Sequence, residues 1–70
     1  MKFILSLIIC SQVGNTCMPP YQWPKQFNTQ YDCLMYGYEE SMNKMKEIGK
    51  QDINQYGVFV RFICTPENTI

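Results

Sequence analysis

The chain opens with an apolar run, KFILSLIIC over residues 2–10, which could be either a removable leader or a strand. Lys2 followed by seven residues of which only Ser6 is polar matches the minimum pattern of a secretory leader. However, the following stretch, residues 11–15, lacks the small-x-small pair of a cleavage site. The run is also far shorter than the about 20 apolar residues that span a bilayer. It therefore predicts no transmembrane helix and makes a poor leader.

The same run has the properties of a buried strand. It is apolar at both parities and rich in β-branched isoleucine, which is typical of a strand covered on both faces. Cleavage near residue 14 would remove Cys10 and leave three cysteines, whereas retention leaves four, which can all pair. We therefore expect a retained central strand over about residues 3–10. A secreted cysteine-rich inhibitor or effector peptide, processed near residue 14, is the alternative.

Size and charge limit what the chain can be. Seventy residues form one domain, 1–70, near the lower limit of size for a single apolar core. We therefore expect disulfide bonds or a binding partner to add stability. Four cysteines are dense for a cytosolic protein and ordinary for a small exported or virion-surface domain, which favours an oxidising environment: virion, periplasmic or extracellular. Six basic and six acidic residues leave no basic stripe for nucleic acid and no support for membrane-surface binding.

The segment 15–27 combines prolines with aromatic residues. Pro19, Pro20 and Pro24 forbid a helix and disfavour a central strand, so we expect an extended loop. Tyr21 and Trp23 give this loop two interpretations: a lid that completes a thin core, or an exposed binding edge.

A helix is predicted over about residues 29–49. Thr29 can act as the N-cap, and Gly49 is a plausible stop. Gly37 would allow close approach to the sheet, and methionines on or beside the apolar face would fill the core. The apolar stripe expected to be buried consists of Leu34, Tyr38, Met42 (or Ser41), Met45 and Ile48.

A second strand is predicted over about residues 57–64. Its β-branched and aromatic residues alternate, and one face carries Phe59, Arg61 and Ile63, of which the arginine indicates a partly wet surface. Strand, helix and strand predict a small α+β domain in the α/β class, a β-α-β unit with two parallel strands and a right-handed crossover. One intervening strand from residues 11–27 is the alternative.

The parallel arrangement would gather all four cysteines at one pole of the domain. Two disulfides are expected, with Cys10–Cys64 and Cys17–Cys33 preferred among three pairings. A four-cysteine zinc site or a thiol-redox site is the alternative. It is weakened by gaps of 6, 15 and 30 residues and by the lack of histidine and of C-x-x-C.

The remaining sequence offers little for catalysis. The carboxylates look like solvated helix-face or capping charges, and no phosphate loop, zincin or EF-hand motif is present. We therefore expect a non-enzymatic protein-interaction or structural module that needs no cofactor and binds a partner protein or itself, for example as a homodimer. The expected interaction surface consists of Tyr21, Trp23, Phe59, Arg61 and Ile63.

Several segments carry a resemblance. MKFILSLIIC, NTCMPP, YDC followed by GY, and RFICT are similar to a group of small uncharacterised proteins encoded by marine tailed phages. The resemblance covers most of the chain and implies a phage-associated origin, with a virion component or a host protein as partner. It brings no catalytic residues and no ligand.

Overall fold

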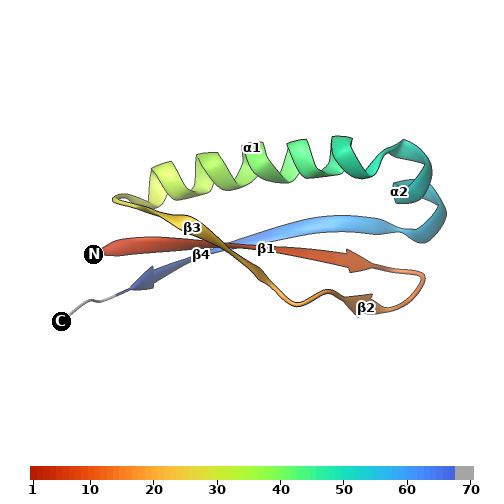
Figure 1. The fold of residues 1–70 in the computed structure, drawn as a ribbon, viewed down its shortest axis with the longest axis horizontal. Helices are drawn as coiled ribbons and strands as arrows, with labels where there is room; N and C mark the ends of the chain where they lie inside the picture. The colour runs from red at the N-terminus through yellow and green to blue at the C-terminus, as the bar shows by residue number, and fades with distance from the viewer. Residues whose placement is uncertain (68–70) are drawn as a thin grey trace.

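A computed structural model describes residues 1–67, in which a four-stranded sheet carries a long helix on one face (Figure 1). The domain is elongated, with extents of 44 × 20 × 16 Å. The elements in chain order are β1 (Lys2–Ser11), β2 (Thr16–Cys17), β3 (Tyr21–Phe27), α1 (Gln30–Ile48), α2 (Lys50–Tyr56) and β4 (Val58–Glu67).

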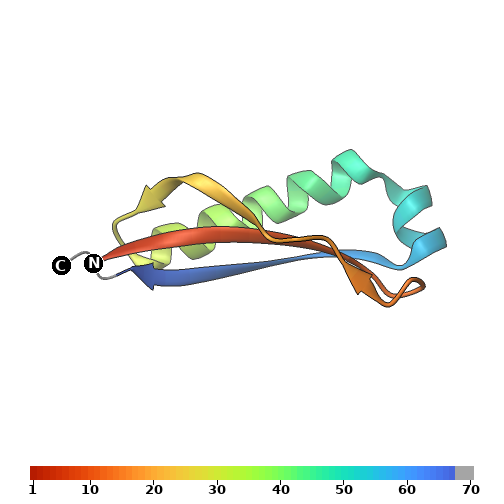
Figure 2. The same cartoon turned by 60° about the horizontal axis from the view of Figure 1, so that its bottom comes forward.

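The predicted central strand is confirmed as β1, which every other strand pairs with. Along one edge β1 is antiparallel to β4 over its whole length, from Lys2 opposite Glu67 to Ser11 opposite Val58. Along the other edge it pairs with β2 and then with β3, also antiparallel. Figure 2 shows β1 between β3 and β4. Only one face of β1, with Phe3 and Leu5, packs under α1, so the expectation that β1 is covered on both faces is wrong.

The small α+β class is confirmed, but the expected parallel pairing of the first and last strands is wrong. A tight turn over residues 12–15, in which Asn15 has a positive φ of 50°, sends the chain back along β1 as β2 and β3. As a result, α1 begins beside the start of β1 and runs in the same direction as β1. The chain then returns as β4, which is antiparallel to β1. The helical crossover instead joins β3 to β4, two parallel strands with β1 between them.

The predicted extended loop is partly a strand. Residues 18–20 have no regular structure, but Tyr21–Phe27 form β3 at the edge of the sheet. Pro24 lies where the register with β1 shifts, between the pairs Ile4–Gln26 and Ser6–Gln22. Proline is tolerated at such an irregularity of an edge strand because no ladder hydrogen bond is needed there.

The predicted helix caps are confirmed. The Thr29 hydroxyl accepts a hydrogen bond from the backbone N–H of Asp32 (3.1 Å), which satisfies one of the free amides of the first turn. Gly49, with φ 99°, ends α1, and its N–H donates to the Met45 carbonyl at 3.0 Å. The short helix α2 follows and ends at Gly57 in the left-handed region.

The face of α1 that packs on the sheet differs from the predicted apolar stripe, of which only Ser41, the alternative to Met42, is buried. Its buried residues are Cys33, Gly37 and Ser41, one per turn. As expected, Gly37 allows close approach: a Cβ there would lie 2.9 Å from Cγ of Phe62 in β4 and closer still to two other ring carbons. Met42 and Met45, which were expected to fill the core, are exposed.

The core is small and lies between α1 and the sheet. Leu5, Phe27 and Cys33 are its buried centre, one each from β1, β3 and α1. The half-buried residues packed around them are Phe3, Trp23, Tyr36, Phe62 and Cys64.

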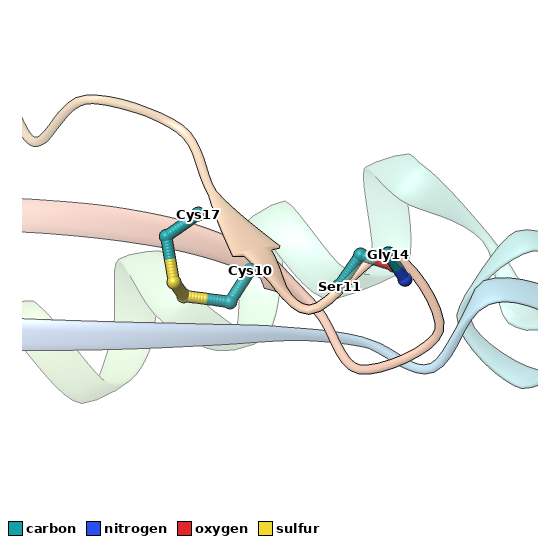
Figure 3. Close-up of a disulfide and its surroundings, with 4 residues drawn as sticks. All are labelled: Cys10, Ser11, Gly14 and Cys17. Carbon is teal, nitrogen blue, oxygen red and sulfur yellow. A yellow bond between two sulfur atoms is a disulfide. The ribbon is translucent and has the colours of Figure 1, made fainter.

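All four cysteines form disulfides, as expected, but with a different pairing. Cys10 is bonded to Cys17 and Cys33 to Cys64, so the preferred pairing and the expected cluster at one pole are both wrong. The antiparallel β4 is the reason, because it places Cys64 opposite Leu5 and away from Cys10. Figure 3 shows Cys10–Cys17 closing the hairpin formed by β1 and β2.

Candidate protein-binding surface

The five residues predicted to form one interaction surface lie on two different faces of the sheet. Residues directly opposite on paired strands share a face. Phe59 and Arg61 lie opposite Cys10 and Ile8, on the face away from α1, and Ile63 follows at the next position of the same parity. We call this uncovered side, with Ile4, Ile8, Phe59, Arg61 and Ile63, the open face.

Tyr21 and Trp23 lie on the helix side instead. The Trp23 ring contacts Tyr36 of α1 edge-on, with centroids 5.9 Å apart, and Tyr21 contacts Trp23 at 5.4 Å. Tyr36 also packs on Phe27 at 5.1 Å. The lid interpretation therefore fits Trp23, which is half-buried against the core, whereas Tyr21 remains 57% exposed.

A hollow of about 310 Å³ lies beside these aromatic residues. Its wall is mostly apolar, and its only charged group among the described residues is Lys44, whose ammonium is 3.2 Å from the carboxylate of Glu47. The residues that line it are Leu7, Ile9, Met18, Pro19, Tyr21, Trp23 and Lys44. The hollow is thus a mostly apolar depression beside the exposed Tyr21 ring.

An apolar surface that sequence reasoning missed is on the outer side of α1. Five large apolar side chains are exposed along the helix, and we call them the outer stripe. They are Tyr31 (70% exposed), Met35 (52%), Tyr38 (63%), Met42 (59%) and Met45 (38%). Four of them were expected to be buried: Tyr38, Met42 and Met45 in the apolar stripe, and Met35 as core filling. Their spacing of 4, 3, 4 and 3 residues is visible in the sequence, but periodicity alone does not tell a stripe that faces its own sheet from one that faces outward.

Within the outer stripe, Tyr38 leans toward β4, whereas Met35 borders a hollow that is also lined by β3 residues. Tyr38 packs edge-on against Phe62 of β4, with ring centroids 4.7 Å apart. Tyr36, two residues earlier and so on the other flank of the helix, packs on the β3 residues Phe27 and Trp23. The two flanks of α1 therefore differ: aromatic contacts join one flank to β3, and the other flank, with exposed apolar residues, contacts β4.

The outer edge of β4 is itself unpaired. Among residues 1–67, no strand pairs with β4 on the side away from β1. An unpaired strand of ten residues presents a row of backbone donors and acceptors to a further strand. Pro66, near the end of β4, is the one proline in it. The edge and the outer stripe together form a continuous candidate binding surface.

The described residues offer little for metal binding or membrane crossing. No group of three or more histidine, cysteine, aspartate or glutamate side chains within residues 1–67 is placed to hold a metal ion. A four-thiolate zinc site does not fit, because the sulfur atoms are in two separate disulfides. No helix within the described range is long and apolar enough to span a membrane.

No protein-family model, curated protein or solved structure matches this chain.

Proposed function

We propose that this domain is a non-enzymatic protein-interaction module that binds a protein partner through the outer stripe of α1 and the adjacent edge of β4. The observation that carries the proposal is the balance of apolar residues: among residues 1–67, eleven large apolar side chains are exposed, and five hydrophobic residues are buried. An exposed, contiguous apolar patch on a small domain is typical of an interaction site.

The arrangement of the reactive groups supports a binding role over catalysis. The chain has no histidine, and its four cysteines are held in disulfides, which removes the usual nucleophiles and general bases. Asp32, Glu39, Glu47 and Asp52 are exposed on the helices, where nothing in residues 1–67 sets a carboxylate pair apart in an apolar pocket.

The two disulfides are compatible with an oxidising compartment. The similarity of several segments to small marine phage proteins supports a phage-encoded origin, with a virion component or a host-directed binder as the setting. Residues 1–14 belong to the proposed module because they supply β1, on which every other strand depends.

The proposal is tested by photo-crosslinking from single positions of the full chain in its natural source. A photoreactive residue replaces Met42, in the outer stripe, or Asn43, which is exposed on the other side of the same helix. Position 42 is expected to give one discrete protein adduct, identified by mass spectrometry of the crosslinked peptides, and position 43 none. Equal adducts from both positions, or none from either, would contradict the proposal.

A further inference from the structure

The outer stripe has the residue spacing of a helix-helix seam. Tyr31, Met35, Tyr38, Met42 and Met45 follow the alternating steps of 4 and 3 that place apolar residues along one side of a paired helix. From Tyr31 to Met45 the stripe is about 21 Å long at 1.5 Å per residue. A seam of this length can be covered by a helix of similar length, and the α1 helix of a second copy of the chain has that length.

We propose that this surface binds a second copy of the chain across a two-fold axis, with the two β4 strands paired antiparallel and the two α1 helices packed antiparallel above them. The inference rests on the proposed function, because it names the partner of the same surface. A two-fold interface is self-complementary, so one surface must supply both halves. Here it supplies a strand edge that can pair with itself and a seam that can pack on itself.

The distances within the fold suit this arrangement. α1 packs chiefly on β4 and β1, with fewer contacts to β3, so its axis lies over the β1–β4 pair. Adjacent strands are about 4.8 Å apart, so a helix over that pair would lie about 10 Å from its copy across a β4–β4 junction. Packed helices are separated by about 8–10 Å, so pairing of the strands brings the two stripes into contact.

The charges on α1 select the antiparallel direction. Between residues 30 and 40 the helix carries Asp32, Glu39 and Glu40 and no basic residue. Between residues 41 and 50 the chain carries three lysines and one glutamate, a net charge of 3 − 1 = +2. An antiparallel pair places the acidic half of each helix beside the basic half of the other, whereas a parallel pair opposes like charges.

The association is tested with the full, oxidised chain by sedimentation equilibrium over a wide concentration range. A dimer is expected. Met42→Lys is expected to weaken it by about a hundredfold, because each copy loses a buried methionine and gains a lysine at the seam. Asn43→Lys, which makes the same charge change on the other side of the helix, is expected to leave the dimer unchanged. Ile63→Lys, on the open face, is also expected to leave the dimer unchanged.

The direction of pairing is tested on the chain with the photoreactive residue at position 42. In an antiparallel dimer, position 42 crosslinks to residues 31–38 of the other copy, whereas a parallel dimer would give crosslinks near residue 42 itself. Crosslinks to residues 31–38 together with the Met42→Lys effect would establish the proposal. A monomer at all concentrations, a parallel crosslink, or a dimer broken by Ile63→Lys and not by Met42→Lys would overturn it. A specific adduct between position 42 and a different protein would overturn self-pairing while leaving the proposed binding function in place.

Discussion

The ring of Phe62 in β4 lies directly against the backbone of Gly37 in α1. A Cβ added at position 37 would be 2.9 Å from Cγ of that ring, closer than side-chain carbons approach in folded proteins. Cys33 and Ser41, the other buried residues of this helix face, are also small. The helix therefore fits the sheet by presenting small residues to a large aromatic one.

Gly37→Ala is expected to destabilise the domain even though alanine is the better helix former. Alanine gains about 1 kcal/mol in helix propensity, whereas overpacking a filled site costs roughly 1–3 kcal/mol, so a net loss of about 1 kcal/mol is expected. Chemical denaturation followed by the fluorescence of the single tryptophan, Trp23, measures it. Asn43→Ala, at an exposed position of the same helix, should be slightly stabilising. An equal gain from both substitutions would show that Phe62 does not constrain position 37.

Ser41→Ala is expected to stabilise the domain by about 1 kcal/mol. The Ser41 hydroxyl is buried, and no residue among 1–67 forms a hydrogen bond with it, so alanine removes an unsatisfied polar atom and favours the helix. Ser11→Ala is the matched control. The Ser11 hydroxyl donates to the Tyr56 carbonyl (2.7 Å) and accepts from the Gly14 N–H (3.2 Å), so its loss should cost about 1 kcal/mol. A destabilised Ser41 variant would mean that the hydroxyl has a partner.

The two disulfides are expected to contribute unequally. Their sequence separations of 31 residues for Cys33–Cys64 and 7 for Cys10–Cys17 correspond to about 3.7 and about 2.5 kcal/mol at 25 °C in the chain-entropy model. Removing Cys33 and Cys64 together by alanine substitution should therefore cost more, and the empty space left in the core adds to the loss.

The pairing itself can be checked by digestion without reduction. A peptide linking residue 10 to residue 17 and another linking residue 33 to residue 64 are expected. A peptide linking Cys10 to Cys64 would contradict the antiparallel register of β1 and β4.

A chain that lacks residues 1–14 is expected not to fold. The deletion removes β1, to which β2, β3 and β4 are each paired, and leaves Cys17 without its partner. Circular dichroism and denaturation of the oxidised 15–70 fragment measure this, with the full chain as reference. Cooperative unfolding of the fragment would favour the alternative of a processed secreted peptide.

Much of the fold follows from local patterns. The β-branched runs of β1 and β4, the Thr29 cap and the Gly49 stop each depend on neighbouring residues, and each was predicted correctly. The path of the chain between β1 and α1 was not predicted correctly. One tight turn decides whether the segment 16–27 covers the sheet as a loop or joins it as strands, and that decision reversed the direction of β4 and the pairing of the cysteines.

The binding surface shows the same limit. Phe59, Arg61 and Ile63 were correctly placed on one face by the period of two, but Tyr21 and Trp23 joined the other face once their segment became β3. The close approach at Gly37 was predicted correctly, but large residues of α1 were wrongly placed on the buried face because hydrophobic periodicity favours large residues. A sheet that presents Phe62 requires small residues on the helix. That requirement is set by the sheet and cannot be recognised from the helix sequence alone.

The central place of β1 also determines when the protein can fold during synthesis. β1 is made first, yet its longest pairing is with β4, which is the last of the described elements to be made. The growing chain therefore holds its most apolar strand half-paired until residues 58–67 have emerged, with only the β1–β2–β3 hairpin to cover one edge. Such distant pairing slows folding. During that interval the exposed edge of β1 is open to aggregation or to capture by a chaperone.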